Sequence, residues 1–313
     1  IGIDVLDSNY TVISGNFLVN NRRGIRLSFG FYNNASKNRI VGPGFYGIEA
    51  GGLHTTIINN DVVYCMNGIE LGGNFKKIIR NNIMENWEAG IHISSGKNNT
   101  IYHNNFVDNN KHVSFNYPRP GDHNTWDNGY PSGGNYWSGY EDKYPNATEL
   151  DNSGIWNTPH NVCAYNVDNY PLIVPTRPIT RKFTAYSSFE VEIYSNSSIS
   201  DFQFNTTEKK ISFNITGPKG TAGFCNLSIP NGLLWGVLSL YIDGSLLVEN
   251  VDYTKVDNGT HFIFYVTYLH SSHALEISAT EAIPEFLHLL LTLLIITVSS
   301  ITITLAKKKS FRK

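Results

Sequence analysis

Charged residues are scarce in this 313-residue chain. They make up 16% of it, whereas an average soluble protein has about 25%. The 24 Lys and Arg do not exceed the 26 Asp and Glu, which argues against a nucleic-acid-binding protein. A disordered chain is also excluded, because such chains are poor in aromatics and aromatics reach 13% here. The three cysteines, Cys65, Cys163 and Cys225, are too far apart for a disulfide framework or a metal motif.

Asparagine takes the place of the missing charge: there are 37, and 30 of them precede Val174. In the same part of the chain Gly-Ile pairs recur at steps of 22, 23, 21 and 22 residues. Such a repeat, rich in Gly, Asn and β-branched residues, predicts a right-handed parallel β-helix of about six coils. Like side chains would stack from coil to coil, ~4.8 Å apart, with asparagine ladders at the turns. The glycines are Gly2, Gly24, Gly47, Gly68 and Gly90, and His112-Val113 is a degenerate sixth copy.

One predicted column faces outward, because it lies between two inward positions of each coil. Glu49 and Glu70 would be adjacent there, about 5 Å apart, with His92 beyond Glu70 and Arg26 beyond Glu49. Paired carboxylates can perform acid–base chemistry, and retaining sugar hydrolysis uses a similar spacing. Glu49, Glu70 and His92 are therefore the candidate catalytic residues, and the alternative is a solvated ladder of compensating charges. The candidate ligand-binding residues are Arg26, Trp87 and Tyr102, of which the two aromatics are equally consistent with ordinary turn packing.

A Trp/Tyr/Gly-rich run follows the coils at residues 124–137 and is too dense in Gly and Pro for a helix or a long strand. We expect it to cover the open end of the solenoid. Residues 1–175 resemble the NosD-type right-handed β-helix proteins, also grouped as carbohydrate-binding and sugar-hydrolase repeat domains. The run Trp126–Trp137 and the later Asp168–Leu172 are similar to an archaeal surface branch of that family. In that branch an acidic stretch suggests Ca²⁺, but the matching residues 151–160 keep only Asp151 as a carboxylate, so we expect no cofactor and leave Ca²⁺ as the candidate ion.

The family name implies copper delivery to nitrous-oxide reductase. Copper(I) prefers clustered Cys and Met ligands. Met66 and Met84 are not in a paired motif, and His103 and His112 fall on different columns of the repeat. A copper accessory role is therefore the weakest of the expected functions.

Residues 176–282 change character, because short alternating runs separated by turn signals replace the asparagine repeat. This pattern predicts a β-sandwich, which we expect to serve as a spacer. The predicted domains are the β-helix at 1–116, its cap at 117–175, the sandwich at 176–282 and a membrane anchor at 283–313. The fold class is therefore all-β with one C-terminal transmembrane helix.

The anchor is predicted from residues 287–306, an apolar stretch long enough to span the hydrocarbon core of a bilayer. The basic residues that follow place the C-terminus in the cytoplasm by the positive-inside rule. We therefore expect a single-pass cell-surface protein with an extracellular N-terminal part, and the missing initial Met suggests a fragment. Its candidate glycosylation sites are Asn9, Asn34, Asn98, Asn146, Asn196, Asn205, Asn214, Asn226 and Asn258.

The expected function is polysaccharide binding, or a structural or adhesive role in the cell envelope. The first alternative is a polysaccharide-cleaving lyase or hydrolase that uses the outward carboxylates, and the second is the copper role. The expected partners are the membrane and polysaccharide, not nucleic acid. The sequence does not predict the oligomeric state.

Overall fold

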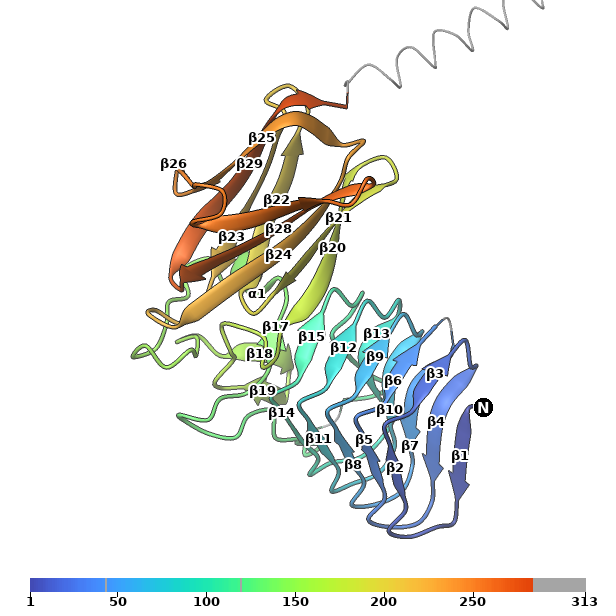
Figure 1. Cartoon of the computed structure of the whole chain (residues 1–313). Helices are drawn as coiled ribbons and strands as arrows, with labels where there is room; N and C mark the ends of the chain where they lie inside the picture. Colours follow the sequence, from blue (N-terminus) through green and yellow to red (C-terminus); the bar gives the residue numbers. More distant parts are fainter. Residues whose placement is uncertain (43, 119, 284–313) are drawn as a thin grey trace, which may run out of the picture.

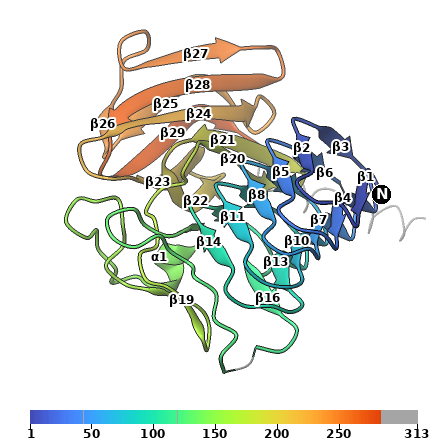
Figure 2. The ribbon, with the colours of Figure 1, turned by 90° about the horizontal axis from the view of Figure 1, so that it is seen from below.

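The computed structural model describes residues 1–42, 44–118 and 120–283. Its N-terminal half is a solenoid of parallel strands in three sheets (Figures 1 and 2). The first sheet contains β1 (Ile3–Leu6), β4 (Arg23–Ser28), β7 (Tyr46–Ala50), β10 (Asn67–Leu71), β13 (Ala89–Ile93) and β16 (Val113–Phe115). The second contains β2 (Val12–Ser14), β5 (Asn34–Ser36), β8 (Thr56–Ile58), β11 (Lys77–Ile79) and β14 (Thr100–Tyr102). The third contains β3 (Phe17–Val19), β6 (Arg39–Val41), β9 (Asp61–Val63), β12 (Asn82–Met84), β15 (Asn105–Val107) and β17 (Tyr136–Trp137).

The Gly-Ile repeat has a steric cause. The isoleucine of each pair lies in the core, and Ile25, Ile48 and Ile69 are fully buried in one stacked column. The preceding glycine lies where two coils approach most closely. A Cβ atom on Gly47 would lie 2.2 Å from Val62 Cγ1 and 2.5 Å from the carbonyl oxygen of the equivalent glycine one coil later. From Gly2 to Gly90 only glycine fits this column, because protein interiors leave no room for an extra methyl group at such distances.

An asparagine ladder joins the coils along the corner between the second and third sheets. Each member accepts, at its Oδ1, the backbone N–H and the Nδ2–H of the equivalent residue one coil earlier, at 2.9–3.0 Å for most steps. Its own Nδ2 also donates to a carbonyl of the preceding coil, as Asn81 does to Ile57 at 2.9 Å. The hydrogen bonds from one ladder asparagine to the next therefore all point towards the C-terminal end, whereas the bonds from Nδ2 to the carbonyls point back towards the start. The members are Asn16, Asn38, Asn60, Asn81, Asn104 and Asn135.

The ladder ends on Asp168, which is fully buried. Its Oδ2 accepts the backbone N–H of Asn135 at 2.8 Å and the indole N–H of Trp137 at 2.9 Å. Its Oδ1 accepts the backbone N–H of Tyr170 at 3.1 Å. A carboxylate suits this position because it accepts hydrogen bonds and has no N–H group that would need a further coil.

The Trp/Tyr/Gly-rich segment packs on the last coil of the solenoid. The ring of Trp137 stacks on Phe106 of the last complete coil, with centroids 4.3 Å apart, and on its other face stacks His160 at the same distance. Trp126 is also fully buried and donates to Asn166. The cap contains α1 (Tyr140–Lys143) and the hairpin of β18 (His160–Cys163) and β19 (Asn166–Asp168).

The C-terminal part is a sandwich of two antiparallel sheets with its own apolar core (Figure 1). One sheet contains β20 (Ile179–Tyr186), β21 (Phe189–Ser195), β24 (Ala222–Pro230), β28 (His261–Leu269) and β27 (Tyr253–Asp257). The other contains β22 (Ser198–Asn205), β23 (Lys210–Thr216), β29 (Ser272–Ala282), β25 (Leu234–Ile242) and β26 (Ser245–Leu246).

Two arginines join the sandwich to the solenoid. Arg181 on β20 donates to both carboxylate oxygens of Asp108, at 2.9 and 2.7 Å. Arg177, in the segment before β20, donates to Asp61 of β9 at 2.7 Å. Bidentate arginine–carboxylate pairs fix orientation as well as distance. The sandwich is thus held against the solenoid, and Ile179 at the start of β20 packs with Val107 of β15 (Figure 1).

The predicted fold class is wrong in two respects. The solenoid has about five turns, not six, because the chain leaves it after β16 and returns only through β17, which pairs with β15. In the described part of the chain no helix is long and apolar enough to cross a membrane. The predicted membrane helix, 287–306, lies outside the described residues.

Candidate functional site

The outward column of the first sheet has the predicted register. Glu70 pairs with Glu49 on one side and with His92 on the other, and Glu49 pairs with Arg26. The side chain of Arg26, however, binds Asp4 at 2.8 Å. Glu49 is instead bound by Arg23, which the sequence reasoning missed, with Nε 3.0 Å from its Oε2.

The two carboxylates of this column have different surroundings. Burial raises the pKa of Glu70, and the negative charge of Glu49 adds to this, while the Ser94 hydroxyl and His92 oppose it. Within the described residues Glu70 Oε2 is buried and has no hydrogen-bond partner. His92 Nδ1 lies 2.7 Å from the hydroxyl of Ser114. An arginine thus lies beside one carboxylate, and burial favours the neutral form of the other. Different surroundings of two carboxylates divide the acid and base roles in glycosidases.

A second site lies in a groove of about 680 Å³ between the solenoid and the sandwich. Trp87, predicted to bind ligand, lies at its solenoid side and is 57% exposed. The half-exposed Tyr64 and the stacked ring of Phe202 also line the groove. Its polar groups include Glu85, whose pKa is raised mainly by burial, and Lys182. Flat apolar surfaces combined with a few polar groups are typical of ligand sites.

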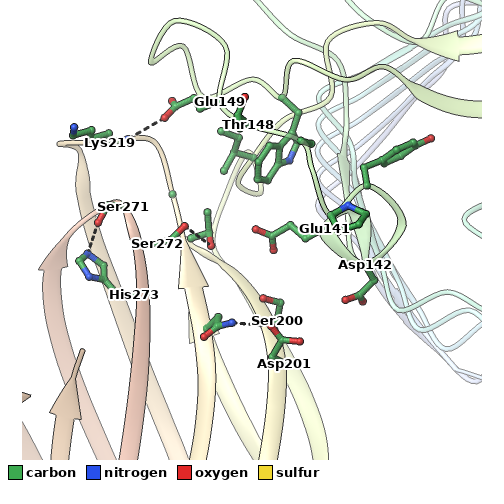
Figure 3. Close-up of a pocket in the computed structure, with 18 of the residues that line it drawn as sticks. Glu141, Asp142, Thr148, Glu149, Ser200, Asp201, Lys219, Ser271, Ser272 and His273 are labelled. Carbon is green, nitrogen blue, oxygen red and sulfur yellow. Dashed lines mark hydrogen bonds between the residues drawn. The ribbon is translucent and has the colours of Figure 1, made fainter. Parts of the chain in front are cut away.

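A third hollow is a cleft of about 960 Å³ between the cap and the sandwich (Figure 3). Glu141 of α1 points into it, facing Asp201 of β22. Burial raises the pKa of Glu141, although hydrogen bonds from Thr216 and Ser200 oppose the shift. The rim carries Asp142, Glu149, Lys219 and His273. The cleft therefore has more acidic than basic groups.

Most of the remaining predicted site residues lie apart from these hollows, but Asn214 lines the cleft. Tyr102 is half-buried and packs edge-on against His103, with centroids 4.9 Å apart. The nine candidate glycosylation asparagines are all exposed or half-buried and stay a prediction. Asp151 is exposed in a turn of the cap. In the described ranges no group of three His, Cys, Asp or Glu is placed to hold a metal ion.

The cysteines and methionines do not fit a copper(I) site. Burial among apolar groups raises the pKa of Cys65 to about 12 and also raises that of Cys225, which keeps both thiols protonated. Cys163 lies apart from them in the cap hairpin, and Met84 packs in the apolar cluster outside the third sheet. Soft metal ions need several such ligands at one point, and the fold separates them.

Several residues of the hollows could not be found from the sequence. Glu85, Glu141 and Asp201 belong to no common motif, and only the docking of the sandwich brings the solenoid, the cap and β22 together. Trp87 and Tyr102 were the aromatics predicted to be exposed along the coils, and of the two Trp87 is exposed while Tyr102 is half-buried.

Comparison with known proteins supports the solenoid. Residues 1–142 match the family described as NosD, periplasmic copper-binding protein. No curated protein matches the chain. Among solved structures, the Dettilon tailspike protein aligns with a TM-score of 0.31 and 13% identity over 85% of this chain, which spans 56% of the tailspike chain.

The predicted location is also corrected. A single-pass protein at the cell surface was expected, but the described segments contain no helix able to cross a membrane and the matched family is described as periplasmic. The match does not reach the predicted anchor or the sandwich, because it ends at residue 142. Residues 1–142 form a NosD-like parallel β-helix.

Proposed function

We propose that the protein binds polysaccharide, and that the groove at Trp87 is a binding site. The observation that carries this proposal is the position of Trp87, which is 57% exposed at the edge of a hollow rather than packed in a turn. An indole left in water offers a large apolar face, whose burial against a ligand is favourable. A sugar ring has apolar C–H faces that can cover such a surface, and hydroxyl groups around its edge.

The polar groups of the groove suit those hydroxyls. The carboxylate of Glu85 can accept hydrogen bonds, and the ammonium group of Lys182 can donate them. Lys182 is already oriented by Glu192, whose Oε1 lies 2.9 Å from its Nζ. The groove lies between the turns that follow β9 and β12 of the solenoid on one flank and β20 of the sandwich on the other. Such preorganised polar groups give specificity rather than most of the affinity.

Replacing Trp87 with alanine is expected to weaken glycan binding by about tenfold or more, because one stacked aromatic contributes about 1–3 kcal/mol at a comparable stacking site. A glycan array would identify a ligand, and titration calorimetry would measure the change. Trp235→Ala, which removes a partly exposed indole on the sandwich, is the matched control and should bind as the wild type does. Binding that is equal in both variants would place the site elsewhere, and an array without ligands would contradict the proposal.

The carboxylate column supports a second candidate function, the cleavage of polysaccharide. The observation that favours it is the contrast between Glu49, bound by Arg23, and Glu70, whose pKa burial raises. In hydrolysis Glu70 would donate a proton to the leaving glycosidic oxygen as the C–O bond breaks, and Glu49 would form a bond to the sugar carbon. Water would then break that bond, giving its hydroxyl to the sugar carbon and its proton to Glu70.

For this candidate we expect Glu70→Gln to abolish any depolymerising activity while leaving the fold intact. The assay is release of reducing ends from neutral and uronic-acid glycans, with circular dichroism as the check of folding. The control is Glu88→Gln, a neighbouring half-buried carboxylate outside the column. Activity that survives Glu70→Gln would remove the column from the reaction.

A further inference from the structure

We propose that the groove at Trp87 continues into the cleft of Figure 3, and that the combined groove binds an extended polysaccharide with free amino groups. This inference rests on the proposed polysaccharide binding and names its ligand class. It is carried by three observations: the hollows adjoin one another, they contain carboxylates without an ion-pair partner, and Arg181, Lys182 and His273 beside them already contact other acids.

The continuity follows from shared residues. A smaller hollow of about 320 Å³ lies between the other two. It shares Asp108, Arg181 and Phe183 with the groove at Trp87. It shares Glu141 and Asp201 with the cleft. The combined groove follows the boundary between solenoid and sandwich and exceeds the usual size of a site for one small molecule. A linear polymer can contact the whole length of the combined groove.

The carboxylates of the combined groove are largely free of cations. Among the described residues no ion pair involves Glu141, Asp142 or Asp201. Asp201 accepts only a neutral amide, from Asn214 at 2.7 Å. Glu141 accepts neutral hydroxyls, from Thr216 and Ser200. These carboxylates leave the floor and rim of the cleft negatively charged.

Three of the four cations beside them have acidic partners of their own, and Lys219 is the exception. The guanidinium of Arg181 is held by both oxygens of Asp108. Lys182 pairs with Glu192, and His273 lies 2.7 Å from Asp243. Lys219 lies at the outer rim, where its backbone N–H faces Glu149 (Figure 3). The charge that a ligand meets is therefore mainly negative.

This charge distribution selects among polysaccharides. A chain of uronic acids would bring its carboxylates beside Glu141 and Asp201, and such like-charge contacts are costly. A chain with protonated amino groups would meet complementary charge at the cleft while a sugar ring covers Trp87. The attraction should decrease with ionic strength, because the carboxylates of Asp142 and Asp201 are exposed.

The test compares glucosamine oligomers with their N-acetylated forms and with galacturonate oligomers, each as a disaccharide and a hexasaccharide. Titration calorimetry in slightly acidic, low-salt buffer should show the glucosamine hexamer binding about tenfold more tightly than either other hexamer, and about tenfold more tightly than its own disaccharide. High salt should remove the advantage over the N-acetylated hexamer.

The double variant Asp142→Asn with Asp201→Asn should lose that advantage while keeping the Trp87-dependent binding of the disaccharide. Asp7→Asn with Asp252→Asn, which changes two exposed acids elsewhere, is the matched control. Equal affinity for acetylated and free hexamers, or an unchanged double variant, would overturn the inference. If disaccharides bind through Trp87 and hexamers gain nothing, only this inference fails. If no oligomer binds, the proposed function fails with it.

Discussion

Replacing Asp168 with alanine is expected to lower the free energy of unfolding by about 4 kcal/mol. The substitution leaves three buried donors without an acceptor: the backbone N–H groups of Asn135 and Tyr170 and the indole N–H of Trp137. Each orphaned buried donor costs about 1–3 kcal/mol, and part of that cost is recovered as the cap relaxes. Urea unfolding at about pH 8 is the measurement, because burial raises the pKa of Asp168 to about 7.

Two variants separate the ladder from a general effect of mutation. Asp168→Asn keeps one oxygen but turns an amide N–H₂ towards groups that are themselves donors, so we expect a loss of about 2 kcal/mol. Asp122→Ala removes a half-buried carboxylate elsewhere in the cap and should cost much less. If Asp168→Ala and Asp122→Ala unfold at the same urea concentration, the hydrogen bonds that Asp168 accepts at the end of the ladder do not contribute the expected stability.

The second large effect is the loss of stability in acid caused by His160. Burial lowers the pKa of this imidazole to about 3, and the neighbouring positive charges of Lys143 and His112 act in the same direction. In the unfolded chain the pKa is about 6.5. Between these values the unfolded state binds a proton that the folded state excludes. The contribution of His160 is therefore fully present above pH ~6.5 and is lost as the pH falls towards ~3.

His160→Phe should remove this dependence. Phenylalanine can keep the stack on Trp137, and within the described residues His160 Nδ1 has no hydrogen bond to lose. Near neutral pH the variant should be about as stable as the wild type, and near pH 4 it should be more stable by about 3 kcal/mol. Urea unfolding across this pH range measures the difference. His123→Phe, at an exposed position, should follow the wild-type profile, and parallel profiles for His160→Phe and the wild type would contradict the prediction.

The repeat made the solenoid predictable from sequence, because the same steric and hydrogen-bonding demands act in every coil. The Gly-Ile pairs, the stacked asparagines and the register of Glu49 and Glu70 all follow from one period. The capping role of the Trp-rich run was predictable for a related reason, since an open end of stacked coils must be covered.

The hollows were not predictable, because they depend on contacts between segments with no common period. The pairs Arg177–Asp61 and Arg181–Asp108 join residues more than 70 positions apart, and no local pattern indicates either. Glu141 and Asp201 face each other only because these pairs fix the sandwich against the cap (Figure 3). The number of coils was overestimated because β16 repeats the sequence pattern without being followed by a complete turn.

The one-way hydrogen bonds of the asparagine ladder limit how this fold can change in length. Each inner asparagine of the ladder donates two hydrogen bonds to the next asparagine and accepts two from the previous one. A duplicated coil could therefore be inserted between two existing coils without leaving one of these groups unpaired. No duplicated coil could follow Asp168, because its carboxylate has no N–H group to donate to a further coil. Lengthening by gene duplication is therefore open towards the start of the chain and closed at the cap.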